Sequence, residues 1–236
     1  MSKSRTAIVT GSARGIGKSI ALRLAQDGYD VCVNDVSANQ AGIDEVVKEI
    51  QATGRKATGC VADISILSDV EKLVQHSVSE LGPLDTMIAN AGIAQVKALL
   101  DLTEQDLKRM FEVNVYGVIT AFKPFPLLSH YSASKWAVRG LTQAFAMEMA
   151  EHKITVNAYA PGIVGTAMWD LIDEELAKKS GAKKGEMIKK YVTELTAMGR
   201  TSVPEDVSKV VSFLSGPDSD FMTGQTVVVD GGIVYT

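Results

Sequence analysis

The chain has 236 residues, of which 46% are apolar, 22% are charged and 20 are glycine, a composition typical of a globular protein with a sizeable core. Its formal net charge of −4 lacks the basic surplus of a nucleic-acid-binding surface, so no nucleic-acid partner is expected. No stretch approaches the roughly 18 consecutive apolar residues that a membrane span needs. Residues 1–5 lead straight into an apolar strand, without the apolar region of a signal peptide. We therefore expect a cytoplasmic protein with no membrane partner.

Short apolar runs alternate with amphipathic stretches along most of the chain. This pattern predicts a parallel sheet covered by helices on both faces, an α/β fold in a single domain over residues 1–236. Ser68 with Glu71, and Thr103 with Asp106, have the spacing of side chains that cap a helix start. The predicted strands are 6–10, 31–33, 57–62, 84–89, 154–160 and 226–229; the predicted helices follow the turn 11–17 and cover 41–53, 68–81, a region around 103–111, 131–150 and 204–214.

A glycine-rich turn follows the first strand and opens the first helix. Its spacing, with glycines at 11, 15 and 17, allows a tight turn and a close approach of the backbone to a pyrophosphate. The helix that follows offers unpaired N–H groups and a positive dipole end. The turn therefore predicts a dinucleotide site that includes Gly11, Arg14, Gly15, Ile16 and Gly17.

An acidic residue, Asp35, ends the second predicted strand. Its carboxylate can accept hydrogen bonds from the hydroxyls of an adenosine ribose, and it would repel a 2′-phosphate. NAD(H) is therefore favoured as the cofactor over NADP(H). Arg14 points the other way, because a basic side chain in this loop can pair with a phosphate.

Tyr131 and Lys135 are spaced i and i+4, which places them on one face of a helix. A phenol with a pKa of about 10 is a poor acid–base group at neutral pH. A neighbouring ammonium favours the phenolate, so Lys135 is expected to lower the pKa of Tyr131. Tyr131 could then give a proton to a carbonyl oxygen while hydride arrives from a nicotinamide.

Together with the glycine-rich turn, this pair resembles the short-chain dehydrogenase/reductase family over nearly the whole chain. The resemblance extends to Ala89-Asn90-Ala91-Gly92, where Ala89 replaces the family's first Asn, and to the C-terminal Val229-Asp230-Gly231-Gly232. It implies a Rossmann-type doubly wound sheet, and it implies that Asn114 holds a proton-relay water near Lys135. The further cofactor contacts that it implies are Asp63 and Ile64 at the adenine, Asn90, Ala91 and Gly92 along the cofactor, Tyr131 and Lys135 at the nicotinamide ribose, and Pro161, Gly162, Val164 and Thr166 at the carboxamide.

Within the family, residues 128–135, 138–143 and 162–169 resemble the diacetyl reductase and 2,3-butanediol dehydrogenase group. The resemblance implies reversible hydride transfer between NAD(H) and a small ketone or secondary alcohol such as diacetyl, acetoin or 2,3-butanediol. It also implies a homotetramer built partly through the helix that bears Tyr131. Met168 and Trp169 either form an apolar wall for such a ketone or pack a lid onto the core.

The sequence departs from the family just before Tyr131. Only 16 residues, 115–130, separate Asn114 from Tyr131, where the family has the rest of a helix, a parallel strand and a loop with a catalytic serine. A crossover with its helix already needs at least about 10–12 residues. The family's serine position is occupied by Val118, and Pro124 and Pro126 oppose a strand. We therefore predict that one internal strand is missing, through a deletion of about 25 residues near Ala121–Phe125.

This departure keeps an alternative open: a non-catalytic NAD(H)-binding pseudoenzyme, or a truncated splice or gene-model product. Ser129 and Ser132 lie near Tyr131 outside the family's serine position, and Ser129 could substitute for that serine. His130 adjoins Tyr131 and could border the substrate. The polar stretch 170–190 could be a mobile lid or a solvated surface helix. Cys32 and Cys60 are expected as reduced core thiols, and with scattered histidines they predict no metal site.

Overall fold

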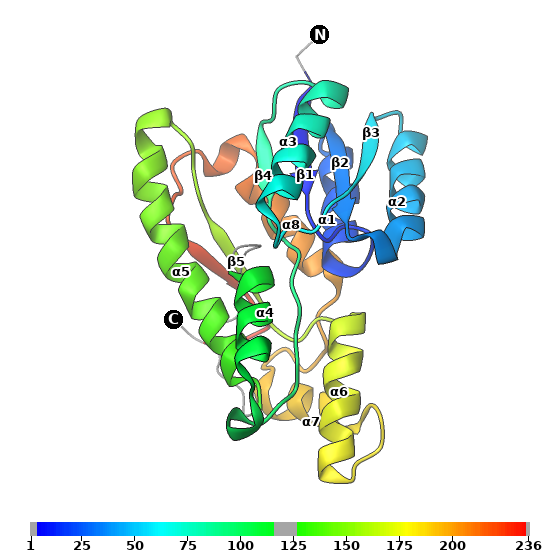
Figure 1. Ribbon diagram of the computed structural model, residues 1–236, viewed down its shortest axis with the longest axis vertical. Helices are drawn as coiled ribbons and strands as arrows, with labels where there is room; N and C mark the ends of the chain where they lie inside the picture. The colour runs from blue at the N-terminus through cyan, green and yellow to red at the C-terminus, as the bar shows by residue number, and fades with distance from the viewer. Residues whose placement is uncertain (1–3, 116–126, 235–236) are drawn as a thin grey trace.

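Strands and helices alternate along most of the chain in the computed structural model, which describes residues 4–115 and 127–234 (Figure 1). The strands are β1 Arg5–Val9, β2 Tyr29–Asp35, β3 Ala57–Val61, β4 Thr86–Ile88, β5 Ala158–Pro161 and β6 Thr226–Val229. The helices are α1 Gly15–Gln26, α2 Gln40–Ala52, α3 Leu67–Leu81, α4 Glu104–Asn114, α5 Ser129–Met149, α6 Ala167–Ser180, α7 Glu186–Leu195 and α8 Pro204–Leu214. Short 3-10 turns occupy η1 Ser37–Asn39, η2 Leu99–Asp101, η3 Ala150–His152 and η4 Pro217–Ser219. Among the described helices none is long and apolar enough to cross a membrane.

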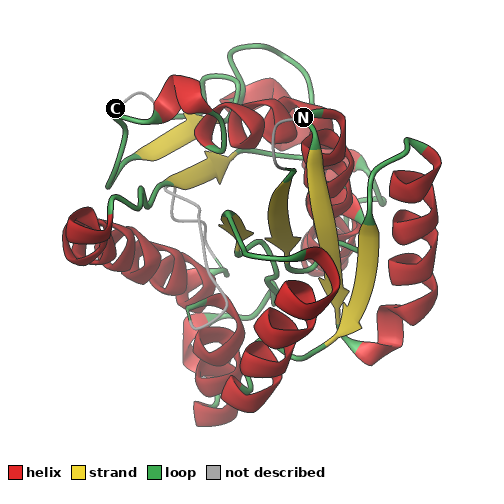
Figure 2. Cartoon of the chain, turned by 90° about the horizontal axis from the view of Figure 1, so that it is seen from above, coloured by secondary structure: helices red, strands yellow, loops and turns green. Residues whose placement is uncertain are grey.

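The strands are all parallel, but they form two sheets. One sheet has the order β3-β2-β1-β4, and β5 pairs with β6 in the other. Within residues 4–115 and 127–234, no strand joins the edge of β4 to the edge of β5, in line with the predicted absence of an internal strand. Figure 2 shows the two groups of strands apart. The sequence features that motivated the prediction, Val118, Pro124, Pro126 and the junction 121–125, lie outside the described residues.

The larger sheet is covered on both faces, as the alternation of strands and helices predicts. Ala7, Val9, Val31 and Val33 point to one face, where they pack in one cluster with buried side chains of α1, α2 and α8. Ile8 and Cys32 point to the other face, where Leu73 of α3 covers them. β1 and β2 are thus buried on both sides, which explains why their sequences are apolar runs rather than alternating patterns.

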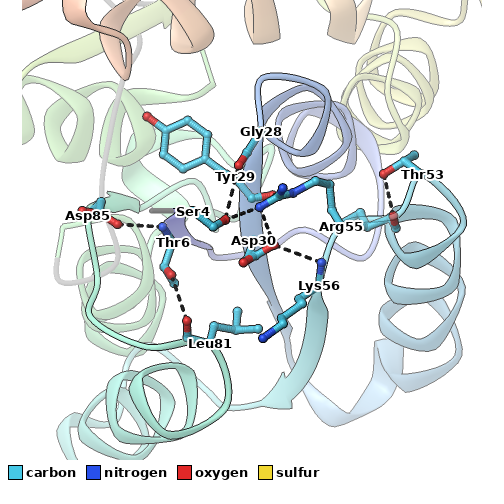
Figure 3. Close-up of polar contacts among 11 residues, drawn as sticks. Ser4, Thr6, Gly28, Tyr29, Asp30, Thr53, Arg55, Lys56, Leu81 and Asp85 are labelled. Atoms are coloured by element: carbon cyan, nitrogen blue, oxygen red, sulfur yellow. Dashed lines mark hydrogen bonds and ion pairs between the residues drawn. The ribbon is translucent and has the colours of Figure 1, made fainter. Parts of the chain in front are cut away.

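Polar contacts hold the end of the larger sheet where β1 and β2 begin (Figure 3). The backbone N–H of Thr6 donates to Asp85 Oδ2 at 2.8 Å, and the Thr6 hydroxyl donates to the Leu81 carbonyl at 3.3 Å. Asp30 Oδ1 accepts from Arg55 Nη2 at 2.7 Å and from the backbone N–H of Lys56 at 3.0 Å. These contacts tie the loops before β3 and β4 to the start of the sheet. In open parallel sheets ligands bind at the opposite edge, where the carboxyl ends of the strands meet.

One predicted helix cap and one predicted strand start are wrong, each for a local reason. The cap at Ser68 and Glu71 does not form, because α3 already begins at Leu67 and Ile66 precedes it. The cap at Thr103 and Asp106 does form, with the N–H of Asp106 donating to the Thr103 hydroxyl at 3.2 Å. The strand predicted from Ile154 begins only at Ala158, because the parallel pairing with β6 starts there, with Ala158 opposite Thr226.

The polar stretch 170–190 is neither a fully solvated helix nor a single element. It spans α6, a turn and the start of α7, and α6 buries Ile172, Asp173 and Leu176. The Asp173 carboxylate accepts the backbone N–H groups of Gly185 at 2.5 Å and of Ile188 at 2.8 Å. A buried carboxylate thus caps the start of α7 and fixes it against α6.

His130, at the start of α5, is buried with 2% of its surface exposed. Neither ring nitrogen has a hydrogen-bond partner among the described residues. Burial lowers the pKa of His130 below its ordinary value; Asp106 opposes this shift and Lys97 adds to it. His130 is therefore held neutral inside the fold.

This state of His130 predicts a pH dependence of stability. The unfolded chain binds a proton at His130 near pH 6.5, whereas the folded chain resists it until lower pH. Stability from this group is therefore fully present above about pH 6.5 and is lost as the pH falls through the lower pKa of the folded state. In urea titrations from about pH 7.5 to about pH 5, the free energy of unfolding should fall more steeply for the parent chain than for His130→Phe. Superimposable pH profiles would contradict the buried neutral state.

Candidate active site

The turn between β1 and α1 brings the predicted glycines against β4. Gly11 has φ +62°, and a Cβ there would lie 2.7 Å from the Ala91 Cα. A Cβ at Gly17 would overlap the Gly11 carbonyl oxygen. Both positions therefore require glycine, and the turn packs tightly on the segment that follows β4. Arg14 precedes α1 and makes no capping hydrogen bond there, so the N–H groups at the start of α1 have no side-chain cap from it.

Asp35, at the end of β2, lies beside this turn. Its Oδ2 accepts the backbone N–H of Ala13 at 3.2 Å, and its Oδ1 accepts the N–H of Val36 at 2.9 Å and the Asn39 amide at 2.8 Å. The carboxylate is thus fixed next to the glycine-rich turn, where the adenosine ribose of a dinucleotide is expected. Arg14 is exposed on the same turn.

Asp63 and Ile64 follow β3 at the same edge of the sheet. Asp63 Oδ1 accepts the Ser65 hydroxyl at 2.6 Å and the Ser65 N–H at 3.0 Å. The Ser65 hydroxyl is the main cause that lowers the pKa of Asp63, and Arg109 at 3.9 Å contributes. Ile64 is buried. The predicted adenine contacts therefore sit on a rigid turn with an ionised carboxylate.

Asn90 connects the end of β4 to the glycine-rich turn. Its Nδ2 donates to the Thr10 carbonyl at 2.9 Å and to the Gly11 carbonyl at 3.1 Å. The Thr10 hydroxyl in turn accepts the backbone N–H groups of Asn90 at 3.0 Å and of Ala91 at 3.1 Å. These four bonds fix the segment 90–92 beside the turn, so one motif of the sequence positions the other.

Tyr131 and Lys135 lie together on α5, as their spacing predicts. Lys135 is buried, and its Nζ lies 5.4 Å from the centre of the Tyr131 ring. Burial lowers the pKa of Lys135 to about 8. Burial also raises the pKa of Tyr131 to about 12, so in this structure the loss of solvent outweighs any lowering of that pKa by Lys135. The physical reason is that loss of solvent disfavours both charged forms.

Asn114, at the end of α4, is buried and holds the chain just after Gly92. Its Oδ1 accepts the N–H of Ile93 at 2.8 Å, and its Nδ2 donates to the Ile93 carbonyl at 2.9 Å. The same Nδ2 lies 3.4 Å from the Ser134 hydroxyl on α5. Asn114 therefore joins α4, α5 and the segment after β4 close to Lys135, but it does not line the cavity described next.

A cavity of about 130 Å³ lies between the start of α1, the segment after β4, α5 and the carboxyl end of β5. It brings together predicted residues from both halves of the chain: Ile16, Asn90, Gly92, Tyr131, Lys135, Pro161, Gly162, Val164 and Thr166. Met168, Trp169 and Ile172 of α6, together with Leu128, form an apolar part of its lining. Met168 and Trp169 also pack on the cluster around Leu128.

The lining includes residues that sequence reasoning did not single out as site residues. Tyr159 of β5 reaches the cavity, and its only sequence signal is a large aromatic side chain between two alanines. Asp230 also lines it; its carboxylate accepts the N–H groups of Gly232, Ile233 and Val234 at 2.8–3.2 Å, and so fixes the C-terminal segment.

The candidates for replacing the family's serine are not at the cavity. Ser129, Ser132 and His130 do not line it, and their side-chain polar atoms are buried without a hydrogen-bond partner in the described parts of the chain. The idea that His130 borders the substrate is therefore wrong. Val118, at the family's serine position, lies outside the described residues.

The chain is similar to known proteins over nearly its whole length. Residues 5–125 match the short chain dehydrogenase family, and residues 120–234 match the family described as enoyl-(acyl carrier protein) reductase. An L-2,3-butanediol dehydrogenase of Corynebacterium glutamicum is 43% identical over 257 residues, covering 98% of this chain and 99% of the relative. A diacetyl reductase [(S)-acetoin forming] of Staphylococcus epidermidis is 39% identical over 258 residues, covering 98% of this chain and 99% of the relative.

A short-chain dehydrogenase/reductase of Armillaria gallica is 40% identical over 260 residues, covering 100% of this chain and 98% of the relative. Because this alignment is longer than the 236-residue chain, the relative carries residues that have no counterpart here.

Solved structures share the fold at similar coverage. An actinorhodin polyketide ketoreductase variant with NADPH superimposes with a TM-score of 0.92 at 29% identity, over 98% of this chain and 97% of that one. A dehydrogenase/reductase of Sinorhizobium meliloti gives 0.87 at 31% identity, over 98% and 95%. With the glycine-rich turn, the Tyr131–Lys135 pair and these relatives, the chain belongs to the short-chain dehydrogenase/reductase family of NAD(P)-dependent oxidoreductases.

Proposed function

We propose that the chain transfers hydride reversibly between NAD(H) and a small ketone or secondary alcohol of the diacetyl, acetoin or 2,3-butanediol type. The observation that carries this proposal is that Tyr131 and Lys135 face one cavity with the start of α1. The apolar lining from Leu128, Met168 and Trp169 suits a small ketone with methyl groups. The relatives at about 40% identity that act on butanediol and diacetyl support the same substrate class.

The residues present fit a dinucleotide. The turn at Gly11 and Gly17 has no room for a Cβ, the uncapped start of α1 suits a pyrophosphate, and Asp35 suits a ribose. Gly11, Arg14, Gly15, Ile16 and Gly17 would hold the phosphates; Asp35, Asp63 and Ile64 the adenosine; and Asn90, Ala91, Gly92, Tyr131, Lys135, Pro161, Gly162, Val164 and Thr166 the nicotinamide half. When bound, NAD(P)H supplies the hydride.

The protein's part in the reaction is to bind the ketone and to move a proton. Tyr131, whose raised pKa keeps it protonated, donates its hydroxyl proton to the carbonyl oxygen as that oxygen gains negative charge. Lys135, with a pKa of about 8, stands beside the ring and stabilises the phenolate that remains. Asn114 keeps the chain after Gly92 against α4 and α5, and so holds the cavity wall in place.

The proposal also covers the oligomeric state and the location of the protein. Leu141 and Phe145, one turn apart on α5, leave about half of their surface exposed, which supports a homo-oligomer, a tetramer in our proposal, that covers this face. The single domain over residues 1–236 and the cytoplasmic location stay predictions.

One observation favours the alternative of dinucleotide binding without turnover. In the described parts of the chain no serine lines the cavity, although the family uses one to bind the substrate carbonyl. Loss of such a donor costs about 10²–10³ in turnover. A truncated splice or gene-model product would have the same property.

Replacing Tyr131 by Phe tests the proposed chemistry. Removing the proton donor should reduce NADH oxidation with diacetyl about 10²–10⁴-fold, while NADH binding is retained. The control is Tyr29→Phe, which removes a hydroxyl that donates to the Ser215 carbonyl far from the cavity and should keep parental turnover. If the parent chain binds NADH but turns over neither diacetyl nor acetoin with NADH, nor 2,3-butanediol with NAD, the result favours the non-catalytic alternative.

The choice between NADH and NADPH tests the role of Asp35. Asp35→Ser removes a carboxylate that repels a 2′-phosphate, so the ratio of the NADPH to the NADH dissociation constant should fall at least about tenfold. Arg14→Ala is the matched variant and should weaken NADPH more than NADH. An unchanged ratio in Asp35→Ser would remove the basis for preferring NAD(H).

A further inference from the structure

Tyr159 spans the space between the two sheets. It lies on β5, with 8% of its surface exposed, and its hydroxyl donates to Asn90 Oδ1 at 3.0 Å. Asn90 follows β4, whose free edge faces away from β1. In the described parts of the chain no strand pairs with both β4 and β5, so this side-chain bond connects β5 to the segment after β4 where the backbone does not join them.

The bond also determines which way the Asn90 amide points. A phenol hydroxyl donates to a carbonyl oxygen, so Tyr159 holds Oδ1 on its own side. The amide Nδ2 then faces the glycine-rich turn and donates to the carbonyl oxygens of Thr10 and Gly11. Burial raises the pKa of Tyr159, which keeps the hydroxyl protonated and able to donate.

This series of hydrogen bonds reaches the cavity at one end and the glycine-rich turn at the other. Tyr159 and Asn90 line the same cavity as Tyr131 and Lys135. Thr10 and Gly11 belong to the turn whose tight approach to Ala91 shapes the dinucleotide site. A shift of β5 relative to β4 would therefore move the nicotinamide side of the cavity relative to the phosphate side.

We propose that Tyr159 is a positioning residue for dinucleotide binding: through Asn90 it holds the glycine-rich turn in register with the cavity walls contributed by β5 and α5. The proposal rests on the proposed function only in that the site takes NAD(P)(H). Tyr159 acts through the Asn90 amide and takes no part in proton transfer.

The experiment compares two tyrosine variants by NADH fluorescence titration of the purified full chain. Tyr159→Phe keeps the ring and removes the hydroxyl, and it should weaken NADH binding about three- to tenfold. Tyr29→Phe is the matched control, because Tyr29 is also buried and loses a hydrogen bond to the carbonyl of Ser215, a residue that does not line the cavity. Both variants should lose similar thermal stability, whereas only Tyr159→Phe should change the dissociation constant.

A double-mutant cycle with Asn90→Ala separates positioning from general destabilisation. If Tyr159 acts through Asn90, Tyr159→Phe should weaken NADH binding no further once Asn90 is alanine. Unchanged binding by Tyr159→Phe, equal weakening by Tyr29→Phe, or additive effects in the cycle would each overturn the proposal. A folded parent chain that binds neither NADH nor NADPH would overturn the proposed function as well, so the two failures are distinguishable.

Discussion

The rest of the site depends on the hydrogen bonds of the Asn90 side-chain amide. It donates to the turn after β1, follows β4 and accepts from Tyr159 on β5, so three strands of two sheets meet at one side chain. In a continuous parallel sheet the backbone ladder keeps the carboxyl ends of the strands aligned. Here the described strands leave that ladder open between β4 and β5, and the hydrogen bond from Tyr159 to Asn90 connects its two parts.

Burial sets the chemistry of the Tyr131–Lys135 pair. Loss of solvent raises the pKa of the phenol to about 12 and lowers that of the ammonium to about 8, so both groups tend toward their neutral forms. A neutral phenol is the proton donor that ketone reduction needs. The reverse reaction needs the phenolate, and the same burial makes that form costly. Reduction also leaves the phenolate behind, so this cost applies in both directions, and Lys135 beside the ring can offset it.

Much of the fold followed from local patterns in the sequence. The glycine-rich turn and the spacing of Tyr131 and Lys135 could be interpreted from the sequence, because each depends on the backbone geometry of a few consecutive residues. The cap at Ser68 failed because a helix start depends on tertiary packing as much as on capping spacing. Tyr159 could not be found, since its partner Asn90 is distant in sequence and the contact depends on how two sheets meet. The pKa of Tyr131 was misjudged because spacing shows the neighbouring charge but not the burial.

This 236-residue chain keeps one cavity for a dinucleotide, we propose, although its described strands form two sheets. The most direct measurement is an equilibrium titration of the purified chain with NADH, followed by cofactor fluorescence and by the protection of β1, β4 and β5 amides from hydrogen exchange. The account predicts saturable binding of one NADH per chain and joint protection of amides in both sheets. A folded chain that does not bind NADH or NADPH, or one in which NADH protects the larger sheet alone, would contradict it.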